Sequence, residues 1–161
     1  AGTRKGAPLG IHSEFIALFN TFDENLSRYL RTNTLKYAKK GDALDTSDPD
    51  FKESNRKRTI NGFMFCNGPH AVTKQHKHVR WYLAGLGSSH GLHGPYISGN
   101  VYGSSSPQMH NVALLAPGLT RTVDVNATEF GKWLVRDAVL SHQHSGMGMF
   151  FDIKEVLHPG A

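Results

Sequence analysis

Short runs of alternating apolar and polar residues, separated by turn residues, dominate the chain. Over residues 120–125 the two kinds of residue take turns, as a strand with one buried face requires. Gly and Pro stand between the runs, where they favour the turns that separate strands. About eight short strands with little helix predict an all-β fold, a Greek-key β-sandwich or barrel.

The expected strands are short and rich in apolar residues. They cover residues 14–22, 59–65, 78–87, 91–99, 110–116, 119–127, 131–138 and 147–157. Asp23 is a good helix cap and predicts a short helical turn up to Leu30, and the polar residues 31–55 predict a long excursion over the surface. We expect one domain over residues 13–157, complete in itself, with an N-terminal extension (1–12) and a C-terminal tail (158–161).

The chain of 161 residues carries a formal net charge of +5, and its basic residues gather in two runs. These are Lys36, Lys39 and Lys40, followed by Arg56, Lys57 and Arg58. Such a surface could bind a polyanion or an acidic extracellular protein, or could simply be solvated. No specific nucleic-acid motif accompanies the runs. No apolar run approaches the roughly 18 residues of a transmembrane helix, so we expect no membrane span.

Cys66 is the single cysteine, so no intrachain disulfide can form. It lies in the apolar run FMFCN, expected to be a strand, where a buried inert thiol and a bond to another chain are the alternatives. Asn25 and Asn126 each begin an N-glycosylation triplet and are the candidate glycosylation sites.

Residues 131–151 read GKWLVRDAVLSHQHSGMGMFF, a frame of the form G-x-W-L, six residues, then S-H-x-H-x-G-M. This frame resembles the copper-binding loop of the ceruloplasmin and hephaestin family, to which coagulation factors V and VIII also belong. Other family motifs are similar to FDENLSRYL, DPDFKESNRKRTINGFMFCN, HVRWYLAGLGSSHGLHG and NVALLAPGLTRTVDV, in the same order. The resemblance covers about residues 15–156 and implies a secreted, cupredoxin-like domain with copper as its cofactor.

The resemblance also implies a set of candidate metal ligands. His93 falls on the first histidine ligand of the family, His142 on the second and Met147 on the axial methionine. Asp137 falls on the cysteine that makes such a centre blue. His90 and His144 lie near the same loops and are weaker candidates: His90 could replace His93 if the glycine-rich segment shifts, and His144 matches a further histidine of the loop.

The loss of the thiolate changes the chemistry expected of this site. A carboxylate is a hard ligand, and two imidazoles with one carboxylate suit Cu(II) and would also accept zinc. We therefore expect a colourless or pale copper site serving as a carrier, a store or a colourless copper centre. The alternatives are a redox enzyme with type 2 copper, or an interaction module with a vestigial metal site that binds polyanions or matrix proteins through its basic surface.

Oxidase chemistry of the family kind is not expected. Histidines that hold the family's copper cluster fall here on Tyr96, Ser98, Arg136 and Ala138. No other catalytic constellation occurs in the sequence, so no catalytic residue is assigned and the chain is expected not to be a ferroxidase. His76 and His78 form a separate H-x-H pair that, on one strand, would share a face and could bind adventitious metal.

Overall fold

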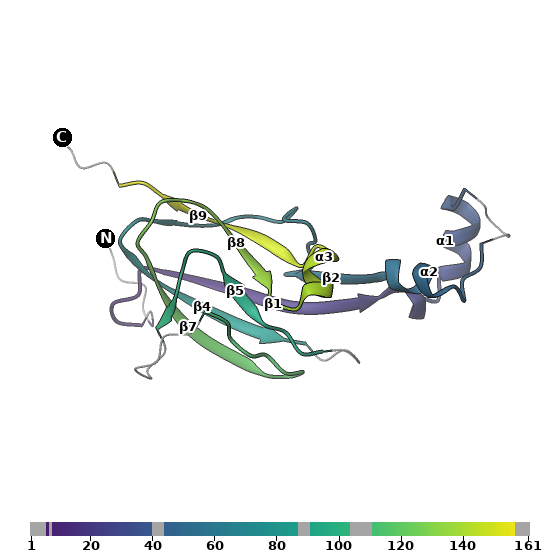
Figure 1. Cartoon of the computed structure of the whole chain (residues 1–161), viewed down its shortest axis with the longest axis horizontal. Helices are drawn as coiled ribbons and strands as arrows, with labels where there is room; N and C mark the ends of the chain where they lie inside the picture. The colour runs from purple at the N-terminus through teal and green to yellow at the C-terminus, as the bar shows by residue number, and fades with distance from the viewer. Residues whose placement is uncertain (1–5, 7, 40–43, 87–90, 104–110, 157–161) are drawn as a thin grey trace.

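The computed structural model describes residues 6, 8–39, 44–86, 91–103 and 111–156. It confirms the expected all-β sandwich, with two curled sheets facing each other (Figure 1). The five-stranded sheet has the order β2-β1-β4-β7-β6, and the four-stranded sheet the order β3-β9-β8-β5. Residues of the expected C-terminal tail, 158–161, lie outside the described residues.

Most neighbouring strands are antiparallel, and β1 with β4 and β3 with β9 are the two parallel pairs. The five-stranded sheet is formed by β1 (Ser13–Asp23), β2 (Arg56–Ile60), β4 (Lys77–Gly85), β6 (Tyr102–Gly103) and β7 (Thr120–Ala127). The four-stranded sheet is formed by β3 (Ala71–Lys74), β5 (Pro95–Ile97), β8 (Gly131–Asp137) and β9 (Gly148–Lys154).

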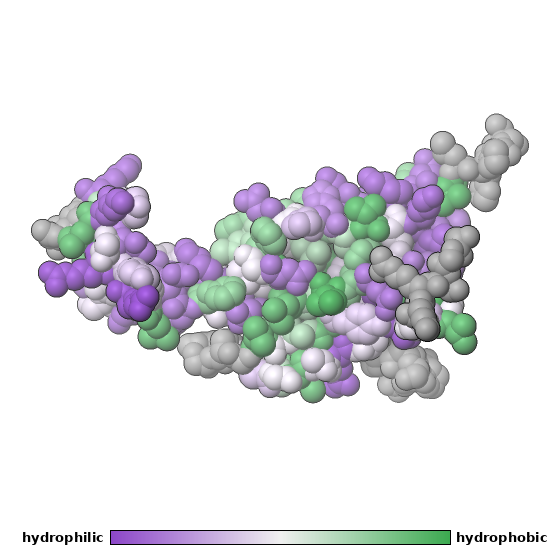
Figure 2. Space-filling view, turned by 180° about the vertical axis from the view of Figure 1, so that it is seen from behind, coloured by the Kyte–Doolittle hydropathy of each residue, from purple (hydrophilic) through white to green (hydrophobic). Residues whose placement is uncertain are grey.

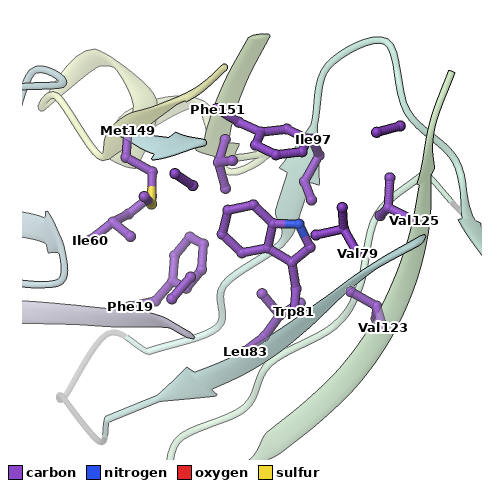
Figure 3. Packing of buried hydrophobic residues seen from close by; sticks show 14 of the residues in the cluster. Phe19, Ile60, Val79, Trp81, Leu83, Ile97, Val123, Val125, Met149 and Phe151 are labelled. Atoms are coloured by element: carbon purple, nitrogen blue, oxygen red, sulfur yellow. The ribbon is translucent and has the colours of Figure 1, made fainter. Parts of the chain in front are cut away.

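Trp81 stands at the centre of the core between the two sheets (Figure 3). Its ring centroid lies 5.0 Å from that of Phe15 and 5.4 Å from that of Phe151, which belongs to the opposite sheet. Buried and half-buried residues alternate along β4, so that Val79, Trp81 and Leu83 point inward together. The alternation of apolar and polar residues that predicted the strands therefore also directs every second side chain into the core.

Three of the expected strands differ from the structure. The strand expected over residues 91–99 is reduced to β5 (Pro95–Ile97). The strand expected over residues 59–65 ends at Ile60, because the backbone turns at Asn61 and Gly62, whose φ angles are +55° and +83°. The strand expected over residues 110–116 is not formed in the described residues 111–116. Only Val112 and Leu115 pair with other segments there, each through an isolated bridge. Turn formation at the Asn-Gly pair outweighs the apolar character of the residues that follow it.

The expected surface excursion contains helices that the sequence did not predict. After the expected turn η1 (Glu24–Leu26), capped by Asp23, come α1 (Leu30–Tyr37) and α2 (Pro49–Ser54). Asp48 caps α2 by accepting from the N–H groups of residues 50 and 51, and Pro49 occupies its first turn. Neither helix buries a residue. Residues 24–39 and 44–55 form an arm that stands off from the sandwich at the far end of β1 and β2 (Figure 1).

No helix in the described part of the chain combines the length and the apolar character that crossing a membrane would take.

Candidate metal centre

Three of the candidate ligands meet at one end of the sandwich. Asp137 is the last residue of β8, His93 precedes β5 and pairs with Leu115, and His142 lies in α3 (Leu140–His144). All three side chains are buried, and one potential ligand atom from each lies within 4.8 Å of the others. Segments far apart in sequence thus bring two imidazoles to one carboxylate.

Hydrogen bonds fix the carboxylate of Asp137 on both of its oxygens. Oδ2 lies 2.7 Å from Nδ1 of His93 and 2.8 Å from Nδ1 of His142. Oδ1 accepts from the backbone N–H groups of Gly94 and Val139, each at 2.9 Å. The carboxylate is therefore oriented before any ion arrives, and it is fully satisfied by protein donors.

The ionised form of Asp137 is favoured although its side chain is completely buried. Burial by itself raises the pKa of this carboxyl. The hydrogen bonds from His142 and His93, with those from the Val139 and Gly94 amides, outweigh burial and hold the pKa well below its usual range. The site therefore carries a negative charge that suits a cation.

Nε2 of His93 is buried and has no hydrogen-bond partner among the described residues. The ring packs against Phe19, with centroids 5.8 Å apart. When Nδ1 donates to Asp137, Nε2 is an unpaired acceptor; when Nδ1 binds a metal, Nε2–H is an unpaired donor. Nε2 therefore lacks a hydrogen-bond partner in both forms. The free-energy cost of burying it unpaired is present with or without a metal, so it does not oppose metal binding at Nδ1.

Met147 is adjacent to the cluster and buried. Its N–H donates to the carbonyl of His142 at 3.1 Å, and its carbonyl accepts from the N–H of Asp137 at 3.3 Å. Its side chain is 1% exposed and belongs to the hydrophobic core. The backbone therefore ties Met147 to two of the three donor residues.

Arg136 does not neutralise its neighbour Asp137. Successive side chains of a strand point to opposite faces, and the guanidinium of Arg136 lies 5.1 Å from the ring centroid of Tyr96, its partner across β5 and β8. Ala138 donates its N–H to the carbonyl of Gly94 at 2.8 Å.

The other histidine candidates lie elsewhere or outside the described residues. His144 is exposed at the end of α3 and is not part of the cluster, and His90 is not among the described residues. The expectation that His76 and His78 share a strand face is wrong. His76 lies in the turn before β4 with a φ of +61°, and the ring of His78 stacks on His12, with centroids 6.0 Å apart.

Cys66 lies in a turn rather than in the strand expected from FMFCN. Its φ is +58°, and its N–H donates to the carbonyl of Gly148 at 3.2 Å. Half-burial raises the pKa of the free thiol. The thiol faces Gly148, where an added Cβ would lie 3.4 Å from Sγ, and it is not part of the histidine–aspartate cluster.

We predict that Cys66→Ser leaves the copper stoichiometry of the protein unchanged, because the thiol lies outside the cluster. Metal analysis of the purified variant beside the parent checks this. A loss of bound copper on this substitution would make Cys66 a ligand and contradict the assignment.

The two glycosylation candidates differ in their surroundings. Nδ2 of Asn25 donates to Asp23 at 2.7 Å and to the carbonyl of Lys52 at 2.8 Å, and its Oδ1 accepts from Asn55. A glycan on this nitrogen would break the bonds that close the base of the arm. Asn126 is exposed on β7, and no hydrogen bond of its side-chain amide is found among the described residues.

We therefore predict that expression through a secretory pathway glycosylates Asn126 and leaves Asn25 unmodified. Mass spectrometry of the parent and of Asn126→Gln measures this, since the variant should lose the glycan mass while Asn25→Gln should not. A glycan on Asn25 of the folded protein would contradict the prediction and show that the contacts of its Nδ2 with Asp23 and Lys52 are dispensable.

The fold and the arrangement of donors define a cupredoxin-like domain. A family model described as multicopper oxidase matches residues 33–156, and the chain belongs to this family. Among solved structures, a multicopper oxidase from Campylobacter jejuni, titled a metallo-oxidase, superposes with a TM-score of 0.66 at 10% identity. That match covers 95% of this chain and 32% of the other, and it supports the fold.

Sequence relatives agree with the resemblance found in the motifs. Hephaestin from Rattus norvegicus is 34% identical over 143 residues, which are 89% of this chain and 12% of that protein. Coagulation factor VIII from Homo sapiens is 33% identical over 86% of this chain and 6% of its own length. Ceruloplasmin from Homo sapiens is 30% identical over 90% of this chain and 14% of its own length. The chain therefore spans only a small part of each of these relatives.

Proposed function

We propose that this protein binds one Cu(II) ion at a non-blue site made by His93, Asp137 and His142, with Met147 beside it as a weak or absent fourth ligand. The convergence of two Nδ1 atoms on one buried, ionised carboxylate oxygen is the observation that supports this proposal most. Imidazole and carboxylate are donors that Cu(II) accepts readily.

The residues fit a divalent ion both in charge and in position. An ionised carboxylate in a buried site is stabilised by a cation, and the two backbone N–H groups on Oδ1 leave Oδ2 directed at the imidazoles. The present contacts of 2.7 and 2.8 Å are hydrogen bonds, so His93 and His142 would hold an ion through Nδ1 only in the tautomer that carries the proton on Nε2. The ion, when bound, supplies a Lewis-acidic centre that lacks a thiolate ligand.

In this proposal the protein is a secreted carrier or store of copper, or a colourless copper centre. Membership of the multicopper oxidase family supports copper as the ion. The same donors also accept zinc. The preference of the site for copper over zinc is therefore part of the proposal. Export is supported by the glycosylation triplets at Asn25 and Asn126.

We do not propose oxidase activity for this domain alone. The residues at the family's copper-cluster positions include Tyr96, Ser98 and Arg136, none of which offers an imidazole. Arg136 and Tyr96 instead contact each other through guanidinium and ring.

The test is metal titration of protein from which all metal has been removed by a chelator. We expect one Cu(II) per chain, an electron paramagnetic resonance spectrum of a non-blue site and no intense blue absorption. His142→Ala should lower copper affinity at least about tenfold. His78→Ala is the matched control, because this exposed histidine lies outside the cluster and should leave the affinity unchanged.

A second candidate function rests on the completeness of the hydrogen bonds around Asp137. Because both oxygens are satisfied without an ion, the cluster could serve as a polar part of the core in an interaction module with a vestigial metal site. Parent protein that binds no stoichiometric Cu(II) or zinc in the titration would support this alternative and reject the copper proposal.

A further inference from the structure

The arm contains one basic segment, residues 28–39, which includes α1. Between Asn25 and Lys39 the chain has no acidic residue, while its four cations are all exposed. These are Arg28, Arg31, Lys36 and Lys39. Figure 1 places α1 away from both sheets, and Figure 2 shows the arm from behind with a largely hydrophilic surface. A surface of this kind, held away from the body, is accessible to a large ligand.

Helix geometry places the two cations of α1 outside the groove that this helix shares with α2. Leu30, Thr34 and Tyr37 line this groove of about 440 Å³ together with Phe51 of α2. At 3.6 residues per turn, Arg31 lies about 90° and Lys36 about 130° around the helix from the centre of the groove, on opposite flanks. Neither cation lines the groove, and both are exposed.

Both arginines of the second basic run pair with carboxylates within the structure. Arg58 forms an ion pair with Glu53, and Arg56 pairs with both Glu53 and Asp23. These pairs lower the pKa of Glu53, with the hydrogen bond from Arg58 contributing most. Lys57 donates to the carbonyl of Ser54. The two basic runs therefore differ in their ion pairs. No ion pair among the described residues involves Arg28, Arg31, Lys36 or Lys39.

We propose that the exposed cations of residues 28–39 bind a linear sulfated glycan. Arg31 and Lys36 lie on α1, Arg28 precedes the helix and Lys39 follows it, and no acidic residue lies between them in the sequence. A group of cations of this kind is complementary to a chain polymer that carries repeated sulfates. This interaction is independent of whether the histidine–aspartate cluster holds an ion.

Nucleic acid and membrane are less suited to this surface. The guanidinium of Arg28 lies 4.9 Å from the ring centroid of Tyr29, and the ammonium of Lys36 lies 5.2 Å from that of Tyr37. A cation therefore lies over one face of each ring, which reduces the aromatic surface on which single-stranded nucleic acid could stack its bases. An interfacial helix needs a broad apolar face, but Leu35 lies about 140° around α1 from Leu30, so the apolar residues of α1 do not form one.

The test compares binding of heparin to the full chain and to Arg31→Glu/Lys36→Glu. We expect the double variant to lose at least about tenfold in affinity and to show a flatter dependence on salt concentration. Lys74→Glu/Arg121→Glu is the matched control, since it changes the charge equally at exposed positions on β3 and β7. Both pairs are exposed, so thermal unfolding should be the same in all three proteins.

Three further ligands make the result specific. Fully desulfated heparin should bind weakly, and neither phosphatidylserine vesicles nor single-stranded DNA should match heparin at equal anion concentration. The proposal is overturned if the control pair reduces heparin binding as much as the α1 pair. It is equally overturned if vesicles or DNA bind the α1 surface more tightly than heparin, or if the parent does not bind heparin at physiological salt.

Discussion

Copper-loaded Asp137→Cys should be intensely coloured, whereas the copper-loaded parent stays pale. The substitution combines a thiolate with His93, His142 and Met147, the four ligands of a blue copper centre. The side chain of Cys is one bond shorter than that of Asp. Its sulfur therefore withdraws from the imidazoles, which now lie 2.7 and 2.8 Å from Oδ2, and leaves space for the ion. Visible absorption after copper titration measures the change.

Asp137→Ser is the matched control for this experiment, because it has the reach of Cys but no thiolate. We expect it to remain without colour at any copper concentration. If Asp137→Cys binds copper with one ion per chain and still shows no intense absorption, the register that places residue 137 at the ligand position is wrong. If Asp137→Ala also binds copper as tightly as the parent, Asp137 is not a ligand and the proposed site is rejected.

Periodicity and turn residues carried most of the information about the fold. The alternation in residues 120–125 corresponds to β7, and the apolar run around Trp81 corresponds to β4. These predictions succeeded because a strand with one buried face must repeat with a period of two. The strand expected to continue past Ile60 failed because the Asn61–Gly62 turn acts locally and overrides apolar content.

The helices of the arm were missed although one of them has a recognisable start. Asp48 followed by Pro49 is a capping residue with proline in the first turn, which favours a helix at α2. The surrounding polarity masked this signal, because neither α1 nor α2 buries a residue and so neither has a strong apolar stripe.

The family frame located the donor residues, but their hydrogen bonds came only from the structure. No pattern in the sequence predicts that Asp137 accepts from the amides of Gly94 and Val139 as well as from both imidazoles. These bonds depend on how β8, α3 and the segment before β5 approach one another. Arg136, the cation next to Asp137 in the sequence, is not its partner, because side chains alternate along β8 and the guanidinium lies over the ring of Tyr96.

The same hydrogen bonds predict a large effect of Asp137 on stability in the absence of metal. Asp137→Ala should lower the free energy of unfolding by about 3–5 kcal/mol, because it removes the acceptor of four hydrogen bonds from a site with no exposure to solvent. Two backbone N–H groups and two imidazoles are then left buried without a partner. Guanidinium unfolding of chelator-treated protein measures the difference.

Asp137→Asn tests the loss of the negative charge separately from the loss of the hydrogen bonds. Its oxygen can accept from Gly94 and Val139, and its amide can donate to Nδ1 of both imidazoles once these adopt the other tautomer. We therefore expect Asn to cost only about 1–2 kcal/mol in the absence of metal. Because it lacks the carboxylate, it should lower copper affinity as strongly as Ala does. A cost for Ala within about 1 kcal/mol of the parent would show that water or rearranged side chains replace the carboxylate, and that Asp137 does not organise this end of the sandwich.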